Sequence, residues 1–501
     1  MKKLTRLSAL LLAFVMLFGM LASCGTTPSD DDTPDTTAGS PETTGTPDTS
    51  DPGLDSSKEE KILPDLPDVR YEGYQYRVRC VGSQRVHWET LGIDAEVKTG
   101  EPINDATLAR NDYIEEKYGI KVVMLEGEDV AGSVIQGVLS QVDEIDIAVS
   151  AVSNISSVAP KSVYDLNQVK YLDLEKPWYD QNFNKEVSIG GRLYSTTGDL
   201  LINDDNGTWC VLFNKRIAED HKIEGLYDLV FNGEWTLDKA YELAKLVTKE
   251  DSGDQTMNYN DIWGFVTESY NGYAMVASTG ERIASKDADD MPYLTAGTEK
   301  FQTVFEKAVN ILGDDSVVGF PADWWDDDPN WVNPFKEGRG LFVMAGLYDL
   351  DEVRGIDDEV GVLTMPKYDA SQQIAYSPIT VSNFTSVYIP ISVSDIERTA
   401  ILTEAMFAES RYTTRVAFYE QTLKGKYSPD AESKRVLDMV IDNRTFDLGA
   451  IYGWGGVITR LRTLMENRTP AFASSWKSIE RIAESAMKKT VKEFEKAENV
   501  G

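Results

Sequence analysis

Residues 104–125 read NDATLARNDYIEEKYGIKVVML, and this stretch decides the fold class. Its first part, 104–118, has the pattern of a helix that begins at an Asn or Asp cap, and 120–125 has that of a strand. Working outward, residues 76–81 (YRVRCV) and 146–149 (DIAV) are predicted strands. Between them, Val134, Ile135, Val138 and Leu139 share one helical face. The alternating order predicts an α/β lobe with a mainly parallel sheet.

Helices dominate farther along the chain. The cap at residues 235–236 precedes an apolar stripe at helical spacing, and Phe301, Val304, Phe305 and Ala308 repeat that spacing. Further helices are expected at 394–410 and 478–497, and short strands near 209–213, 341–344, 360–363 and 386–389. No internal repeat of roughly 20 to 50 residues occurs, so the sequence favours neither a solenoid nor a propeller.

Residues 1–23 are predicted to be an export signal. Three basic residues precede the apolar run Leu7–Leu21, which is shorter than the about 20 residues that a membrane span needs. The run ends at Leu-Ala-Ser-Cys24-Gly, which resembles the lipobox of bacterial lipoproteins, so we expect lipid on Cys24. The alternative is an ordinary signal peptide followed by an incidental cysteine.

Residues 24–68 are expected to be a disordered tether. Within them, residues 25–57 contain nine Thr, five Pro and eight acidic residues, and Leu54 is the only large aliphatic side chain. Such a segment buries too little apolar surface to offset its chain entropy. We therefore expect a folded domain that lipid holds at the cell membrane, outside the cytoplasm.

The composition excludes several classes of function. The 501 residues include 49 Lys and Arg against 83 Asp and Glu, a net charge of −34, which disfavours a nucleic-acid partner. The two histidines, His87 and His221, argue against most histidine-based metal sites and catalysis. Cys80 and Cys210 are expected to be small buried residues rather than a disulfide pair.

Seven short motifs follow one another in a characteristic order. They are YIEEKYGIKV (113–122), DLNQVKYLDLEKPWY (165–179), RLYSTTGD (192–199), LFNK (212–215), WTLD (235–238), PFKEGRGLF (334–342) and MPKY (365–368). Their order, after a lipobox and an acidic tether, resembles that of the extracellular solute-binding proteins (family 1, carbohydrate type) of bacterial ABC importers. The resemblance covers roughly residues 71–495.

The resemblance implies an α/β, two-lobed periplasmic-binding-protein-like fold (type II). Hinge crossings would join the lobes, and a ligand cleft would lie between them. The crossings are expected near residues 196–209, 385–390 and 430–455. Lobe 1 would hold residues 69–197 and 388–430, and lobe 2 would hold 208–385 and 431–501.

A carbohydrate cleft needs flat aromatic platforms flanked by side chains that pair with hydroxyl groups. Arg85 and Trp88 follow the first strand, where open α/β sheets place ligands. Trp324, Trp325 and Asp326 open a loop with three indoles and three carboxylates. For both segments the alternative is an ordinary surface loop.

Other candidate ligand contacts lie near the expected crossings. Trp454 stands among glycines, Asp199 and Asn206 lie on the first crossing, and Tyr270 and Tyr348 follow polar or strand segments. Two further tryptophans, Trp178 and Trp235, are expected to be structural.

Residues 250–261 (EDSGDQTMNYND) carry oxygen-bearing side chains at the spacing of a calcium loop. The candidate ligands are Glu250, Ser252, Asp254, Thr256, Asn258 and Asp261. The loop lacks Asp at its first position, Gly at its sixth and Glu at its twelfth. The alternative is therefore a polar loop without metal, and no other cofactor is expected.

The favoured function is capture of a small carbohydrate, with delivery to an ABC permease by a monomeric, lipid-anchored protein that is not an enzyme. The chain contains no GxSxG, P-loop or HExxH motif. One alternative is binding of another solute, such as a peptide or polyamine. Another is a secreted glycoside hydrolase, which would need two carboxylates across a cleft.

Overall fold

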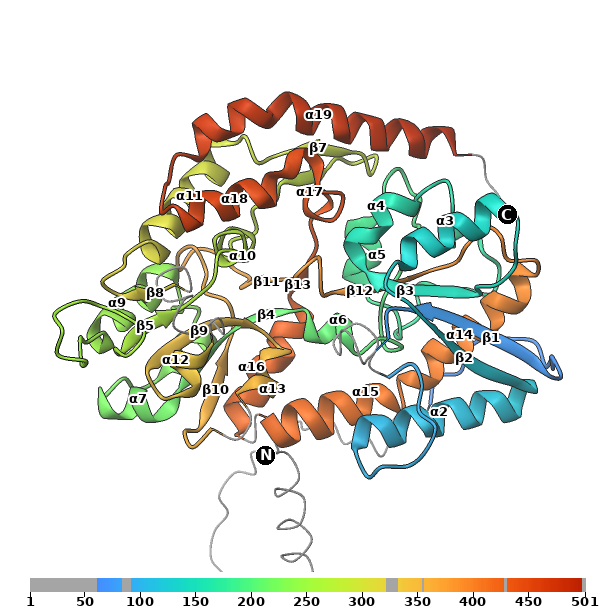
Figure 1. Cartoon of the computed structure of the whole chain (residues 1–501), viewed down its shortest axis with the longest axis horizontal. Coiled ribbons are helices and arrows are strands. Elements are labelled where there is room, and N and C mark those ends of the chain that lie inside the picture. Colours follow the sequence, from blue (N-terminus) through green and yellow to red (C-terminus); the bar gives the residue numbers. More distant parts are fainter. Residues whose placement is uncertain (1–60, 83–91, 321–331, 354–355, 428–429, 498–501) are drawn as a thin grey trace, which may run out of the picture. The chain divides into compact units, whose positions relative to one another are not determined.

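The computed structural model describes residues 61–82, 92–320, 332–353, 356–427 and 430–497. The chain divides into residues 1–61 and residues 62–501, and the described helices and strands belong to the second unit. Two β-sheets, each surrounded by helices, organise this unit (Figure 1). Among the described helices, none has the length and apolarity needed to cross a membrane.

The first sheet contains β1 (Tyr74–Cys80), β2 (Ile120–Glu126), β3 (Ile147–Ala151) and β12 (Thr385–Tyr388), in the order β12-β3-β1-β2. β1 pairs in parallel with β2 and β3, whereas β12 runs antiparallel to β3. α2 (Pro102–Tyr118), α3 (Val130–Ser140) and α14 (Ile396–Ser410) surround this sheet (Figure 1). The mainly parallel α/β lobe predicted from residues 104–125 is confirmed.

The passage from α2 to β2 follows from local chemistry. Gly119 ends α2 in the left-handed region (φ 69°), which costs glycine nothing, and its N–H donates to the Glu115 carbonyl (2.9 Å).

In the next helix, α3, the structure corrects one expectation. Leu139 does not share the buried face of α3, because the helix turns Val130 and Val134 inward and leaves Leu139 74 % exposed.

The second sheet has the order β10-β4-β9-β5-β8. Its strands are β4 (Trp209–Asn214), β5 (Trp263–Val266), β8 (Val318–Gly319), β9 (Gly340–Gly346) and β10 (Val360–Leu363). β5 pairs in parallel with β8 and β9, whereas β4 is antiparallel to β9 and β10.

Two predicted helices flank the second sheet, α9 (Leu237–Val247) and α11 (Glu299–Leu312). As predicted, Thr236 caps α9, its hydroxyl accepting the N–H of Lys239 (3.3 Å). The apolar stripe of α11 is fully buried, which confirms its predicted orientation. Cys80 and Cys210 are likewise buried and free, as expected.

The remaining elements complete the two lobes. The helices are α4 (Ile155–Val158), α5 (Gln181–Val187), α6 (Asn203–Asn206), α7 (Lys215–Asp220), α8 (Leu226–Phe231), α10 (Asn271–Ser278), α12 (Asn333–Lys336), α13 (Asp349–Glu352), α15 (Thr414–Val416), the π-helical segment Ala417–Tyr427, α16 (Ala431–Asp442), α17 (Leu448–Ile451), α18 (Val457–Glu466) and α19 (Phe472–Lys496). The short strands are β6 (Ala284–Lys286), β7 (Pro292–Leu294), β11 (Ser377–Pro378) and β13 (Arg444–Thr445).

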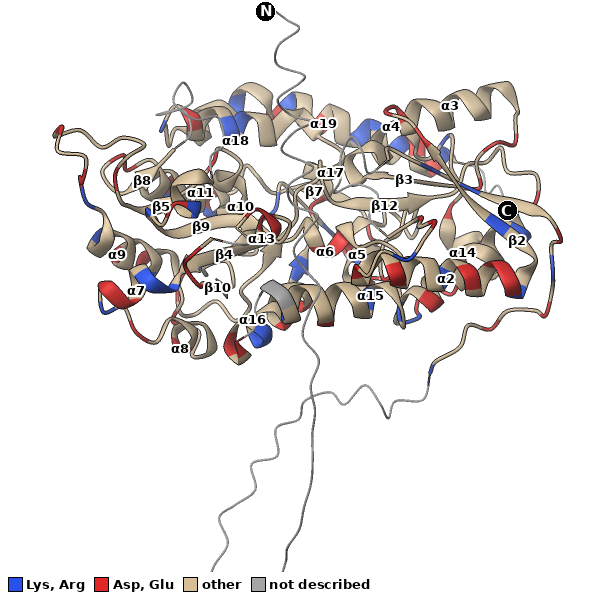
Figure 2. Ribbon diagram, turned by 60° about the horizontal axis from the view of Figure 1, so that its bottom comes forward, with Lys and Arg blue, Asp and Glu red and all other residues tan. Residues whose placement is uncertain are grey.

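The chain passes between the sheets along neighbouring crossings. The first crossing, residues 197–208, is bounded by bridges of Thr196 with Val387 and of Thr208 with Ile379. The returning strand β11 pairs in parallel with β13, which follows α16. A further connection leads from α14 through Ala417–Tyr427 to α16, which packs on β10. In both overall views, α6 of the first crossing lies in the middle, between β4 and α5 or β12 (Figures 1 and 2).

Candidate functional site

An aromatic and polar cluster lies where the first crossing enters the second lobe. We call it the crossing face, and it consists of Asn206, Trp209, Tyr270, Tyr348 and Thr380. The Tyr348 N–H donates to the Asn206 carbonyl (3.1 Å), and the Trp209 and Tyr270 rings stack with centroids 5.6 Å apart. The Trp209 indole N–H donates to the Thr380 hydroxyl. The structure therefore brings together three of the residues singled out from the sequence.

The strand ends explain this convergence. Trp209 begins β4, while Tyr270 and Tyr348 follow the carboxyl ends of β5 and β9, which run antiparallel to β4. Asn206 and Tyr270 are nearly buried, at 9 % and 7 % exposure, and Tyr348 is half-buried. Contact of these residues with a ligand stays a prediction.

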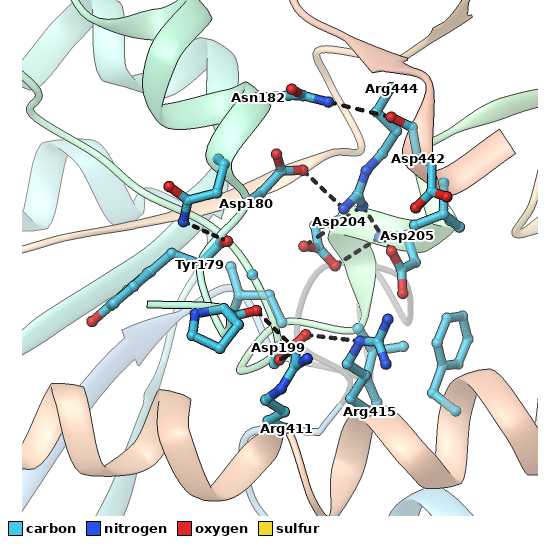
Figure 3. A pocket seen from close by; sticks show the side chains of 17 residues that line it. Tyr179, Asp180, Asn182, Asp199, Asp204, Asp205, Arg411, Arg415, Asp442 and Arg444 are labelled. Atoms are coloured by element: carbon cyan, nitrogen blue, oxygen red, sulfur yellow. Dashed lines mark hydrogen bonds and ion pairs between the residues drawn. The ribbon is translucent and has the colours of Figure 1, made fainter. Parts of the chain in front are cut away.

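A cavity of about 220 Å³ lies on another side of the same crossing. We call it the charged cavity, and Figure 3 shows it lined by carboxylates and guanidinium groups. Its walls come from the segment before α5, the first crossing with α6, the end of α14 with α15, and the end of α16 with β13. Its aspartate and arginine residues are Asp180, Asp199, Asp204, Asp205, Asp442, Arg411, Arg415 and Arg444.

Asp199, one of the predicted site residues, lies in this cavity between two arginines. Its carboxylate pairs with Arg411 (3.0 Å) and with Arg415 (2.9 Å), which face it from the neighbouring helix (Figure 3). Burial raises the pKa of Asp199 to about 6 despite both guanidinium groups. Asp199 is therefore an ion-pair residue in this arrangement.

Arg444 forms the second half of the network. Its guanidinium pairs with Asp180 (2.8 Å) and Asp205 (2.7 Å), and Asp204 lies 3.7 Å away. Burial and the neighbouring Asp205 raise the pKa of Asp204 well above its usual value. Burial also raises the pKa of Asp205, although Arg444 opposes that effect.

The sequence reasoning missed most of this network. The adjacent pair Asp204-Asp205 on an expected crossing was one available signal, and the i, i+4 spacing of Arg411 and Arg415 was another. Nothing local marks Arg444, because its partners lie more than 200 residues earlier in the chain. Only the folded arrangement brings these segments together.

Trp454 occupies a different environment from the one predicted. It is 2 % exposed, stacks on Tyr452 (centroids 5.6 Å apart) and donates from its indole N–H to the Thr490 hydroxyl of α19 (3.0 Å). This is a packing role in the present arrangement. The structural roles expected for Trp178 and Trp235 are confirmed by complete or nearly complete burial.

Several predicted residues lie outside the described residues. They are Cys24, Arg85, Trp88, Trp324, Trp325 and Asp326. Arg85 and Trp88 come after β1 in the chain, beyond Gly82, and Trp324, Trp325 and Asp326 come after β8, beyond Phe320.

Hydrogen bonds within residues 250–261 stabilise the candidate calcium loop. Asp261 is fully buried, and its carboxylate accepts the N–H groups of Asp251 (2.9 Å), Ser252 (2.9 Å) and Asn258 (2.7 Å). Although burial opposes it, these amides lower the pKa of Asp261. In the described part of the chain, no three His, Cys, Asp or Glu side chains converge as metal ligands. Calcium binding by this loop, like the alternative of a polar loop without metal, stays a prediction.

Comparisons with known proteins bear on the fold. No protein-family model matches the chain, and no curated protein matches it. Several solved structures, however, are similar to this chain. The chain is similar to an ABC substrate-binding protein from Listeria monocytogenes in complex with cycloalternan, at 11 % identity and a TM-score of 0.52 over 84 % of this chain and 99 % of that one.

Two further structures give the same result. A cyclo/maltodextrin-binding protein complexed with maltotetraose is 12 % identical, with a TM-score of 0.54 over 85 % of this chain and 99 % of that one. A cyclic alpha-maltosyl-1,6-maltose binding protein from Arthrobacter globiformis is 13 % identical, with a TM-score of 0.53 over 84 % and 99 %. These likenesses, with the two sheets and their crossings, confirm the two-lobed periplasmic-binding-protein-like α/β fold.

Proposed function

We propose that this chain is an extracellular solute-binding protein of a bacterial ABC importer that captures a small carbohydrate between its lobes. The observation that carries the proposal is the arrangement of two α/β lobes joined by adjacent crossings, with an aromatic and polar face at the crossings. Solved proteins of similar fold bind cycloalternan, maltotetraose and a cyclic maltosyl-maltose.

Lobe closure would hold the ligand. In this proposal lobe 1 comprises residues 69–197 and 388–430, and lobe 2 comprises 208–385 and 431–501. Aromatic rings suit the apolar C–H faces of sugars, and Asn, Asp and Arg pair with their hydroxyl groups. The proposed contacts combine the crossing face with two segments that follow β1 and β8, and they are Arg85, Trp88, Asn206, Tyr270, Trp324, Trp325, Asp326 and Tyr348.

The remaining parts of the proposal concern location and partners. Residues 1–23 would direct export, lipid on Cys24 would anchor a monomer at the cell membrane, and residues 24–68 would act as a tether. The closed, loaded lobes would then dock on the permease subunits of the importer, with no catalytic step and no cofactor.

A cationic solute such as a polyamine is the second candidate. The charged cavity contains five carboxylates against three guanidinium groups, and a cation would offset that excess. The crossing face, whose rings suit a sugar, favours the first candidate.

A thermal-shift screen of the full-length chain tests the proposal. The probes are maltotriose, maltotetraose, cellotetraose, xylotetraose, tetra-alanine and spermidine. A ligand at about 100 times its Kd adds about 2.7 kcal/mol to the free energy of unfolding. We expect a shift with one glycan family, and the glycan should be recovered uncleaved. A shift with spermidine or tetra-alanine alone, or a cleaved glycan, would contradict the proposal.

A pair of variants sharpens the screen. Trp325→Ala should abolish the shift caused by the bound glycan, because it removes a platform for the sugar. Tyr293→Ala is the matched control, since Tyr293 is an exposed aromatic residue (49 %) in β7. The control should keep the shift of the unmodified chain.

A further inference from the structure

The long C-terminal helix α19 packs on both lobes. Its second half contributes Met487 and Phe494 to an apolar cluster that also contains Ala148 of β3, in the first sheet. At 25 residues the helix is about 37 Å long, and it runs from beside α11 and α18 toward α4 (Figure 1). Its first half belongs to the apolar core around the second sheet, where it buries Phe472, Trp476, Ile479 and Ala483. The helix α19 therefore joins the lobes in addition to the crossings.

The far end of α19 rests on lobe 1 through a ring pair and an ion pair. The rings of Phe494 and Tyr194 meet edge-on, with centroids 4.9 Å apart. Tyr194 precedes Thr196, which bridges to Val387 of β12 in the first sheet. The ammonium of Lys161 pairs with the carboxylate of Glu493 (2.9 Å). Residues that are distant in the chain thus attach the last turns of the helix to the first sheet.

The β6-β7 hairpin contacts lobe 1 beside the helix end. The Lys286 ammonium donates to the Ser188 carbonyl (3.0 Å), and the Asp290 carboxylate accepts the Ser188 hydroxyl (3.1 Å) and the Gly191 N–H (2.9 Å). β7 itself packs against α19. We call residues 284–294 and 487–496 the strap. Both segments are counted with lobe 2 in the proposed function, yet both contact lobe 1.

The attachment of α19 to lobe 1 is weaker than its attachment to lobe 2. Lys161 and Glu493 are 71 % and 30 % exposed, so water and salt weaken their pairing. A cavity of about 330 Å³ lies beside the helix end, between Tyr164 and Ile391 of lobe 1 and Lys496. Side chains that face a cavity lose part of their packing contacts.

The start of α19, by contrast, is held among aromatic rings of the second lobe. Phe472 lies against Phe301 and Phe305 of α11, with ring centroids 5.3 Å and 5.4 Å apart, and Trp476 packs on Phe472. When the lobes move, α19 should therefore stay with lobe 2, and its last turns should separate from lobe 1.

We propose that the strap is a latch that holds the lobes in the arrangement described here and must release lobe 1 before the lobes can move. The latch contacts lie outside the crossing face, so their release costs the same free energy whichever ligand binds. The strap therefore biases the equilibrium between lobe arrangements and, through it, the affinity for every ligand. The inference rests on the lobe movement of the proposed function and adds a regulation to it.

Distances measured by electron spin resonance on the ligand-free protein test the latch. Spin labels on Leu139→Cys and Leu246→Cys report on α3 and α9, one in each lobe, and both positions are exposed (74 % and 60 %). A second pair, Leu139→Cys with Lys492→Cys, reports whether the exposed side of the α19 end stays on lobe 1. Cys80 and Cys210 are buried and should not react, and Cys24→Ser in the full-length chain removes the remaining thiol.

Variants of the strap should release the latch. Phe494→Ala removes the ring contact with Tyr194, so both label pairs should give broader, displaced distance distributions. Adding Lys286→Met, which removes the hairpin contact with Ser188, should increase both changes. Phe494→Leu keeps most of the apolar volume and should show the same change to a smaller extent, so the test remains decisive if the alanine variant folds poorly.

Phe213→Ala is the matched control for Phe494→Ala. The two phenylalanines are equally buried (4 % and 3 % exposed), and Phe213 also meets a tyrosine edge-on, with its ring centroid 5.5 Å from that of Tyr227. Both partners of this control contact lie in lobe 2, in β4 and α8. The control should lower the melting temperature and leave both distance distributions as in the unmodified chain.

Three results would overturn the inference. One is an unchanged inter-lobe distribution in Phe494→Ala, Phe494→Leu and the double variant. The second is a change in the Lys492 pair alone, which would mean that the helix end frays without affecting the lobes. The third is an equal change in Phe213→Ala. Because no ligand is present, each result leaves the proposed carbohydrate binding untouched, and a failed glycan screen leaves this test unaffected.

Discussion

The two sides of the first crossing differ in the forces that hold them. On one side, the crossing face is neutral: stacked rings and hydroxyl groups join Trp209, Tyr270 and Thr380. On the other, the charged cavity relies on ion pairs such as Arg444 with Asp205 and Asp180. A neutral contact has the same strength at every pH that cells meet, whereas a buried ionic one does not. The first crossing is therefore held by pH-independent contacts on one side and by ion pairs on the other.

Removing Arg444 should give the largest effect. Arg444→Met leaves Asp180 and Asp205 buried without their partner, and breaking such a pair costs about 3–5 kcal/mol. Urea unfolding followed by circular dichroism measures the loss. Arg444→Lys is the control, because it keeps the charge and should lose clearly less. Equal losses for the two variants would mean that the charge of Arg444 contributes nothing.

On the neutral side, Tyr270→Phe should lower the free energy of unfolding by less than Arg444→Met does. The Tyr270 hydroxyl donates to the Ile379 carbonyl (2.7 Å), and losing that hydrogen bond in a buried place costs about 1–2 kcal/mol. Burial raises the pKa of Tyr270, so the hydroxyl stays neutral and the cost should be equal in weak acid and weak base. A cost that changes with pH would show that the two sides of the crossing are not independent.

Asp204→Asn should act in the opposite direction and stabilise the fold. Burial and the neighbouring Asp205 raise the pKa of Asp204 in the folded chain, so folding disfavours its ionised form. The loss of stability is complete at pH values above the pKa of Asp204 in the folded chain. It is absent below the ordinary pKa of an aspartate, because the carboxyl group is then protonated in both the folded and the unfolded chain. Thermal unfolding should show a gain of about 1 kcal/mol near neutral pH that vanishes near pH 4.

Asp369, which is only partly buried, provides the contrast to Asp204. Hydrogen bonds from Ser371 lower the pKa of Asp369, so Asp369→Asn should cause no gain at neutral pH. A stabilising effect of equal size there would point to the overall negative charge of the chain rather than to the cavity.

Calcium should have the smallest effect. The Asp261 carboxylate already accepts three backbone N–H groups, so about 1 mM calcium should leave the melting temperature unchanged, as should a chelator. A rise on adding calcium that a chelator reverses, and that Asp261→Asn abolishes, would restore the metal site suggested by the spacing of residues 250–261.

The sequence predicted the parts of the fold that local periodicity determines. The strand of residues 120–125, the end of α2 at Tyr118 and the cap of α9 at Thr236 lie where they were expected, because each depends on neighbours within a few turns. The expected Asn or Asp cap of α2 was wrong, because the helix begins earlier, at Pro102, and no side chain caps it. Leu139 was placed on the wrong face, since the four apolar positions of α3 span more of the helix than the core covers.

Less of the candidate site than of the fold could be predicted from the sequence. Asn206 could be named because it lies on an expected crossing, Tyr348 because it follows a predicted strand, and Tyr270 because of its polar neighbours. Asp199 was named as a ligand contact because it lies on the expected first crossing, and its pairs with Arg411 and Arg415 could not be foreseen because these arginines lie more than 200 residues later in the chain. Long-range ion pairs leave no periodic pattern, so Arg444 could be found only in the folded chain.

One measurement tests the central claim most directly, namely that a carbohydrate binds between the lobes and brings them together. It is the distance between spin labels on Leu139→Cys and Leu246→Cys, with and without the glycan that shifts the melting temperature most. We predict a narrower, displaced distance distribution that saturates with glycan concentration and is lost in Trp325→Ala. A saturating glycan that leaves the distribution unchanged, or a distribution that responds to spermidine and to none of the glycans, would contradict the account.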